Sequence, residues 1–110
     1  MKCYDVYWCE LGPYRDCIQG GTRPAIVLGN FKGLRNSPII TVIPITTKIK
    51  RLDMKSHVLG YNYQLRKPCM ALCEQIQTVT RTCIGCRHEY VKFDNRKITI
   101  AIKEALGIEI

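Results

Sequence analysis

An arginine in a glycine-rich segment is the first feature of the sequence that could do chemistry. The segment reads Gln19-Gly20-Gly21-Thr22-Arg23-Pro24. Two glycines let the backbone adopt positive φ and approach a ligand closely, and Pro24 biases Arg23 toward an extended conformation. A guanidinium held in this way suits a phosphate, although a turn whose arginine pairs with a surface carboxylate would look the same. Neither histidine, His57 or His88, has a nucleophile nearby in the sequence, so a histidine-based dyad is not indicated.

Two further polar clusters follow or interrupt strand-like runs. Thr46, Thr47 and Lys48 come directly after the apolar stretch 39–45. Hydroxyls and a cation at a strand end can contact phosphate oxygens, although taken alone this pattern favours ordinary strand-end threonines. The second cluster is Glu-Gln-Ile-Gln-Thr at 74–78. Its glutamines could read base edges or simply face solvent.

The charge balance favours a polyanionic partner. The chain has 110 residues, with 17 Lys and Arg against 9 Asp and Glu, which gives a formal charge of +8. Neutralising phosphates releases condensed counterions and so provides affinity for nucleic acid, although a solubilising surface would have the same composition. Four cations fall within residues 47–55, namely Lys48, Lys50, Arg51 and Lys55. We expect this segment to be a mobile basic arm that contacts a nucleic-acid backbone.

The sequence predicts a cytoplasmic protein without membrane association. The longest apolar run, residues 38–45, contains two prolines and is far shorter than the roughly 18 residues of a membrane helix. The N-terminal segment reaches Asp5 at once and does not resemble a secretory signal.

The seven cysteines are an odd number for a disulfide framework, so we interpret them as free thiols in a reducing compartment. A zinc site remains an alternative, because Cys69-x3-Cys73 and Cys83-x2-Cys86 are two closely spaced pairs and His88 follows two residues later. Cys69 and Cys73 flank a run that looks like core, which favours buried thiols. We expect no metal and no cofactor.

Strand patterns dominate the first three quarters of the chain. We predict strands at 6–9, 25–28, 39–45 and 57–59, and a fifth that runs through 69–73 and 75–79. The run 25–28 is apolar throughout, as in a strand buried on both faces. Pro44 predicts an edge or a bulge at the end of the third strand.

The C-terminal segment changes to helical spacing. Apolar residues recur at Ile98, Ala101, Ile102, Ala105 and Leu106. Asp94 or Asn95 would cap the start of this helix and Gly107 its end. We therefore predict one domain over residues 1–110, mainly β with a C-terminal helix.

The order and spacing of these motifs resemble the MazF/PemK family of toxin endoribonucleases. The similarity lies in residues 5–8, 11–13, 19–28, 30, 36–38, 43–46, 56–58 and 73–78. It implies an SH3-like small barrel of the MazF, Kid and CcdB type and a homodimer with a MazE-like antitoxin that covers the RNA groove. It also implies metal-independent cleavage of single-stranded RNA at short motifs by the toxin of a type II toxin–antitoxin system, with 2′,3′-cyclic phosphate and 5′-hydroxyl ends.

The resemblance assigns roles to individual residues. Arg23 matches the catalytic arginine of the family and Thr46 its catalytic threonine. Glu74 and Gln75 match positions that line the RNA site, and Gln19 lies in the bordering loop. With the basic segment, the predicted RNA-binding residues are Gln19, Thr47, Lys48, Lys50, Arg51, Glu74 and Gln75.

Two positions depart from the family pattern. Ile18 stands where many members carry an acidic residue, and Gln77 stands where the family has arginine. Both changes remove a charge near the expected groove, so rate or base preference could differ from those of relatives.

Two other classes of protein remain open. One is a non-catalytic or CcdB-like toxin of the same fold that acts by binding a protein, and the other is a zinc-stabilised nucleic-acid adaptor. The Arg23 and Thr46 pair favours the nuclease, because a pure protein binder has no stated reason to keep it.

Overall fold

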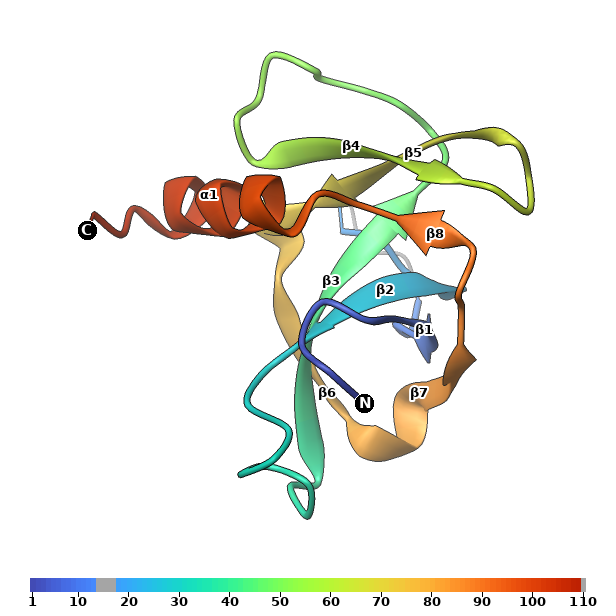
Figure 1. Cartoon of the computed structure of the whole chain (residues 1–110), viewed down its shortest axis with the longest axis vertical. Helices are drawn as coiled ribbons and strands as arrows, with labels where there is room; N and C mark the ends of the chain where they lie inside the picture. Colours follow the sequence, from blue (N-terminus) through green and yellow to red (C-terminus); the bar gives the residue numbers. More distant parts are fainter. Residues whose placement is uncertain (14–17, 110) are drawn as a thin grey trace.

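Strand β3 joins two antiparallel sheets in the computed structural model, which describes residues 1–13 and 18–109 (Figure 1). The larger sheet has the order β7-β1-β2-β3-β6, and the smaller one continues from the end of β3 through β5, β4 and β8. The strands are β1 (Val6–Glu10), β2 (Thr22–Leu28), β3 (Ile39–Thr46), β4 (His57–Asn62), β5 (Lys67–Leu72), β6 (Gln77–Thr80), β7 (Ile84–Arg87) and β8 (Val91–Lys92). Two 3₁₀ turns, η1 (Cys73–Gln75) and η2 (Arg81–Cys83), precede β6 and β7. Helix α1 (Asn95–Leu106) follows β8. The predicted class, mainly β with a C-terminal helix, is confirmed.

Pro44 lies at the point where the strand paired with one side of β3 changes from β6 to β5. On one side it pairs with Ala25 of β2. On the other side β6 pairs with β3 as far as Val42, and β5 begins at Ile45. The expectation of an edge was therefore wrong, because β3 is central. A proline is tolerated here because its missing N–H falls in the gap between β6 and β5.

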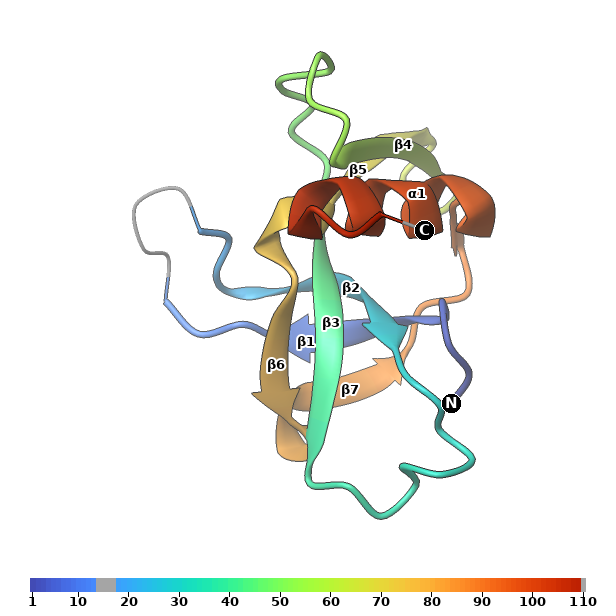
Figure 2. The ribbon, with the colours of Figure 1, turned by 90° about the vertical axis from the view of Figure 1, so that its left-hand side faces the viewer.

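The predicted fifth strand is two strands separated by a corner. β5 ends at Leu72, η1 occupies Cys73–Gln75, and β6 starts at Gln77. Both strands pair with β3, at its opposite ends, so the chain must turn between them (Figure 2). The prediction of one continuous strand was wrong, and the correction places Glu74 and Gln75 on a turn rather than within a ladder.

Strands β2 and β3 separate two apolar clusters. Ala25 and Val27 face one cluster with Cys9 and Val42, whereas Ile26 faces a larger one. The larger cluster also contains side chains of the smaller sheet and α1. The apolar run 25–28 was correctly predicted to be buried on both faces.

Helix α1 begins and ends at the predicted caps. The Asp94 side chain accepts a hydrogen bond from the Arg96 backbone N–H, and Gly107 adopts the left-handed conformation with φ of 67°. Ile98 and Ala101 are buried against the smaller sheet, whereas Leu106 is exposed at the far end of the predicted apolar stripe. Among the described residues, no helix is long and apolar enough to cross a membrane.

Candidate active site

The register of β2 and β3 brings Arg23 and Thr46 to the same end of the ladder. Ala25 pairs with Pro44, and Arg23 lies two residues before Ala25 while Thr46 lies two residues after Pro44. Because side chains alternate with a period of two, both fall on one face of the sheet. The Arg23 Nη1 lies 3.5 Å from the carbonyl oxygen of Ile45, directly beside Thr46.

The glycine-rich segment holds the Arg23 guanidinium. Arg23 Nε donates to the Gly20 carbonyl oxygen at 3.0 Å, and the side chain is half-buried. Gly21 has a φ of 75°, a conformation that glycine adopts at little cost. The Gly21 carbonyl in turn accepts from the Leu11 N–H at 3.0 Å, which ties the segment to the end of β1. The turn therefore fixes the plane of the guanidinium.

Thr46 is buried, with 5% of its surface exposed. Its Oγ1 accepts a hydrogen bond from the Lys48 N–H at 3.1 Å, which turns the chain away from β3. A hydroxyl that accepts a backbone N–H keeps its own hydrogen, so it can still donate to an oxygen placed before it. Thr47 and Lys48 are exposed beside it.

Glu74 is held at the η1 corner by two neighbours on the adjacent chain segment. Ser56 Oγ donates to Glu74 Oε2 at 2.7 Å, and His57 Nε2 lies 3.0 Å from Glu74 Oε1. The His57 side chain is 4% exposed and that of Glu74 is 27% exposed. The sequence did not indicate this histidine–carboxylate pair. The pairing of His57 with Leu72 brings it to Glu74, and that pairing has no signal in the local sequence.

The same histidine anchors the basic loop. His57 Nδ1 lies 3.0 Å from the carbonyl oxygens of both Lys50 and Arg51. Within the loop, Arg51 Nε donates to Asp53 Oδ1 at 3.1 Å, and this contact holds the pKa of the Asp53 carboxyl below its usual value. The predicted RNA contacts Lys50 and Arg51 thus lie on a loop whose backbone is docked, so the expectation of a mobile arm was wrong. Arg51 is also already paired to a carboxylate.

Gln19 and Gln75 meet at the rim of a hollow of about 480 Å³. The Gln19 N–H donates to Gln75 Oε1 at 2.8 Å. The hollow is lined by Leu11, Gly12, Pro13, Ile18, Glu74, Gln75, Ile76 and Gln77. Both departures from the family pattern, Ile18 and Gln77, therefore line one surface. The Gln77 amide donates to the Gln75 carbonyl at 3.3 Å, so neutral groups replace charges there.

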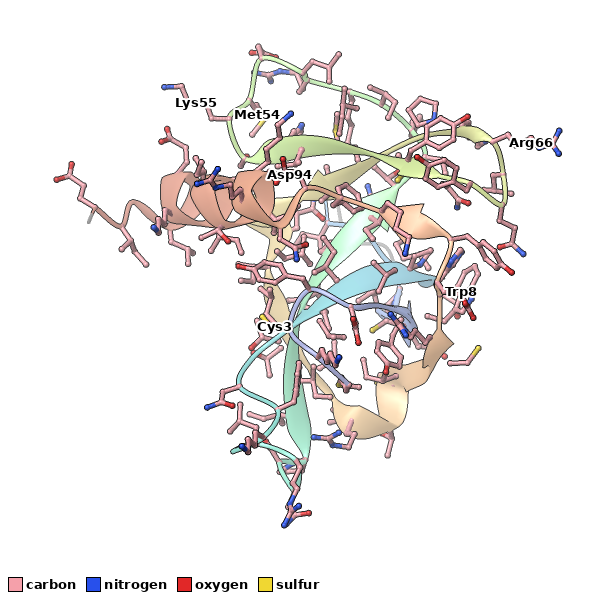
Figure 3. All side chains as sticks on the ribbon, in the orientation of Figure 1. Cys3, Trp8, Met54, Lys55, Arg66 and Asp94 are labelled. Carbon is pink, nitrogen blue, oxygen red and sulfur yellow. The ribbon has the colours of Figure 1, made fainter. Side chains whose placement is uncertain are left out.

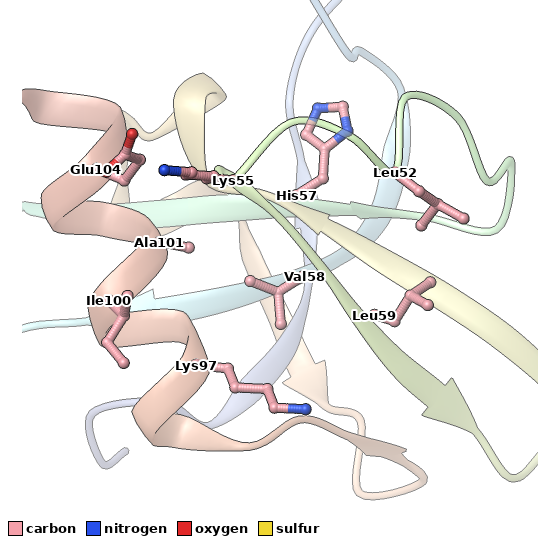
Figure 4. A pocket seen from close by; sticks show the side chains of 9 residues that line it. All are labelled: Leu52, Lys55, His57, Val58, Leu59, Lys97, Ile100, Ala101 and Glu104. Atoms are coloured by element: carbon pink, nitrogen blue, oxygen red, sulfur yellow. The ribbon is translucent and has the colours of Figure 1, made fainter.

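A second hollow, of about 450 Å³, lies between α1 and β4 (Figure 4). None of the predicted site residues lines it. Its walls are mostly apolar, with Val58, Ile100 and Ala101 between the helix and the strand, and the His57 ring is directed away from the helix. Lys55 and Lys97 also line this hollow, but no hydroxyl or amide side chain is among its described lining residues.

The cysteine positions argue against the zinc alternative. Cys69 and Cys73 are buried in the larger core cluster, whereas Cys83 packs against the smaller cluster and Cys86 is exposed. Burial raises the pKa of the Cys69 thiol to about 11 and that of Cys73 to about 12, which disfavours the thiolate that zinc binds. Within the described part of the chain, no three metal-ligating side chains gather.

The fold and the site together define a small basic β-protein with an arginine and a threonine at the end of its two central strands. The chain belongs to the family of PemK-like, MazF-like toxins of type II toxin–antitoxin systems, which matches residues 2–109.

Relatives of this chain agree with that membership. An Endoribonuclease MazF of Staphylococcus saprophyticus subsp. saprophyticus is 32% identical over 111 residues, covering 98% of this chain and 92% of the relative. The Mycobacterium tuberculosis toxin MazF-mt6 has the same fold, with a TM-score of 0.72 at 21% identity over 96% of this chain and 99% of its own. A mycobacterial endoribonuclease in complex with its cognate antitoxin matches with a TM-score of 0.72 at 21% identity, covering 97% and 95% of the two chains.

Proposed function

We propose that this chain is the toxin of a toxin–antitoxin pair and an endoribonuclease that cleaves single-stranded RNA without a metal ion. The observation that carries the proposal is the β2–β3 register, which brings Arg23 and Thr46 to one end of the sheet. Family membership and the relative named Endoribonuclease MazF support the same activity.

RNA supplies the nucleophile for this reaction. The 2′-hydroxyl oxygen attacks the adjacent phosphorus, its proton leaves to a base, and the bond from phosphorus to the 5′-oxygen breaks as that oxygen gains a proton. The products are a 2′,3′-cyclic phosphate and a 5′-hydroxyl. The protein has to hold the attacking and leaving oxygens in line and stabilise negative charge on the phosphoryl oxygens.

Arg23 and Thr46 meet the second requirement. The guanidinium is a planar fork that is effectively always protonated, so its role is charge stabilisation at the phosphoryl oxygens. Its contact with the Gly20 carbonyl orients the fork before RNA arrives. The Thr46 hydroxyl, which accepts from Lys48, donates its own hydrogen to the same phosphate.

The remaining predicted residues bind the substrate around this centre. Gln19, Glu74 and Gln75 border the hollow next to the glycine-rich segment. Thr47, Lys48, Lys50 and Arg51 contact the RNA backbone from the exposed segment after β3. Because Ile18 and Gln77 are neutral, we expect shape and amide hydrogen bonds to contribute to base selection in this hollow beside the Glu74 carboxylate.

The proposed partners are single-stranded RNA, a cognate MazE-like antitoxin and a second copy of the chain, with the cytoplasm as the compartment. The mycobacterial endoribonuclease solved with its cognate antitoxin supports an antitoxin partner. A formal charge of +8 suits both RNA and an acidic protein that competes for the same surface.

The test is incubation of the purified chain with a long RNA in excess chelator, followed by chemical mapping of fragment ends. We expect discrete cuts with cyclic phosphate on one side and 5′-hydroxyl on the other. An intact RNA would overturn the proposal and favour a toxin that acts by binding a protein.

A further inference from the structure

One face of the β4–β8 ladder exposes three tyrosines. Tyr61 pairs with Lys92 across the ladder, and the Tyr63 N–H donates to the Tyr90 carbonyl at 2.8 Å. Side chains alternate along each strand, so Tyr61, Tyr63, Tyr90 and Lys92 share a face while the intervening pair points to the core. The tyrosines are 37%, 61% and 53% exposed, and the rings of Tyr61 and Tyr63 lie 4.8 Å apart.

Aromatic side chains continue from the ladder to β1 through a buried histidine, His88, which is 5% exposed. The Tyr90 ring lies 6.4 Å from the ring of His88, which lies 5.1 Å from that of Trp8 at an interplanar angle of 34°. Trp8 is 36% exposed and pairs with Pro24, the residue directly after Arg23. We call the exposed rings of Tyr61, Tyr63, Tyr90 and Trp8, together with the buried His88 ring between the last two, the aromatic strip. It leads from the β4–β5 hairpin toward the strand that carries Arg23.

The charges beside the strip are mostly positive. The neighbouring segments carry the exposed cations Arg66, Lys67, Arg87 and Lys92 against the exposed Glu89. Arg87 also lies 3.7 Å from Asp5, which offsets part of its charge. Figure 3 shows Trp8 and Arg66 at the same edge of the molecule. Two copies of such a surface would repel each other, so an anionic partner fits it better than a second copy.

Exposed rings next to cations are the means by which proteins hold single-stranded nucleic acid. Bases stack on aromatic side chains while lysine and arginine follow the backbone. We propose that the aromatic strip is a second RNA-binding surface, on which bases of a single-stranded RNA stack outside the Arg23–Thr46 site. This inference rests on the proposed function, because it takes RNA as the substrate. It assigns a binding role to residues that lie outside the hollow bordered by Gln19 and Gln75.

Trp8 is the single tryptophan of the chain, so its fluorescence emission can report on RNA that binds to the aromatic strip. The probe is a fluorescein-labelled oligonucleotide of 2′-O-methyl uridine and adenosine, which lacks the nucleophilic hydroxyl and stays intact. Binding of the full chain should raise the fluorescence anisotropy of the labelled oligonucleotide and, in parallel, quench the emission of Trp8. Tyr63→Ala and Tyr90→Ala should each weaken binding about tenfold. Tyr63→Phe should bind like the wild type, because the ring is kept, and Ile100→Ala on α1 serves as the control.

Three results would overturn the inference. The first is a rise in anisotropy with no change in Trp8 emission. The second is wild-type affinity in both alanine variants, whose folding is checked by their urea midpoints. The third is light scattering in which Tyr63→Ala converts a dimer to a monomer, which would make this face an interface between copies. Cleavage of ordinary RNA by the wild type reports on the proposed function separately, so either proposal can fail alone.

Discussion

Thr46 shows how much of the proposed chemistry depends on one hydroxyl group. It is buried, it terminates β3, and its oxygen accepts the Lys48 N–H. That hydrogen bond orients the hydroxyl so that its own hydrogen points to a different acceptor. The neighbouring Arg23 is oriented by backbone carbonyls. Each group is thus held by main-chain atoms, which is the preorganisation that charge stabilisation in a transition state needs.

Replacing Thr46 with valine removes the hydroxyl and keeps the shape. We expect Thr46→Val to lower the cleavage rate at saturating RNA by about 10²-fold, because one donor to the phosphoryl oxygens is lost. Thr46→Ser should keep most of the rate. Turnover of a short quenched-fluorophore RNA measures both variants, and equal rates for valine and wild type would remove Thr46 from the mechanism.

Gly60 offers a residue-level test of the β4–β8 ladder. A Cβ at this position would lie 2.5 Å from the Lys92 carbonyl oxygen and 2.5 Å from the Phe93 ring. Because backbone has to move, Gly60→Ala should lower the free energy of unfolding by about 1–3 kcal/mol. Urea denaturation measures the loss. In Gly33→Ala, the matched control, the new methyl meets nothing closer than 3.7 Å. A midpoint as high as in that control would contradict the packing described here.

For the individual strands and the helix, sequence patterns predict the elements whose signals lie within a few neighbouring residues. The fully apolar run in β2 and the caps Asp94 and Gly107 each carry their own signal, and those elements were predicted correctly. The η1 corner was missed because it results from the pairing of both β5 and β6 with β3, a strand that is distant in the sequence. Strands β7 and β8 are too short for a period to be visible, so they were missed as well.

The residues of the candidate site also fall into two groups, those that the sequence indicated and those that depend on long-range strand pairing. Arg23 and Thr46 were found through a family resemblance, and the β2–β3 register now explains why they lie together. The contacts of Glu74 with Ser56 and His57 were not predictable, because they depend on how β4 pairs with β5. Long-range pairing therefore limits what local sequence patterns can indicate about this site.

The basic loop between β3 and β4 should act through charge. If Lys50 contacts the RNA backbone, Lys50→Gln should reduce the slope of log affinity against log salt by about 0.7, the value for one phosphate on a single strand. The cut motif should stay the same. Anisotropy titrations at several salt concentrations measure the slope, with Lys103→Gln on α1 as the control. A change in the cleaved RNA motif without a change in the slope of log affinity against log salt would mean that Lys50 contacts bases rather than the backbone.

Across the whole molecule, the two apolar clusters bury the thiols of Cys9, Cys69 and Cys73, and burial favours their neutral form. Burial raises the pKa of Cys9 and Cys69 to about 11 and that of Cys73 to about 12, from 9.0 for an exposed thiol. The folded protein therefore keeps these protons at a pH where the unfolded chain has lost them. The stability that they contribute is fully present below pH 9 and is lost as pH rises toward the folded values.

This linkage predicts a loss of stability in alkali. The free energy of unfolding should fall steadily between about pH 9 and pH 11, because the unfolded chain binds fewer protons than the folded one. Urea titrations at each pH measure it in the presence of a reductant. Cys73→Ala should show a smaller fall, whereas Cys86→Ser should behave like wild type because Cys86 is exposed. A flat profile over this range would contradict the burial of the thiols.

In the proposed reaction, the Arg23 guanidinium stabilises the phosphate during cleavage. The most direct measurement is the single-turnover rate of RNA cleavage in excess chelator for wild type, Arg23→Ala and Arg23→Lys. We predict a loss of about 10²- to 10³-fold for alanine, with the protein still folded. Lysine should recover little, since a point charge lacks the planar fork. Cleavage by Arg23→Ala at the wild-type rate would show that the guanidinium does not take part in the reaction.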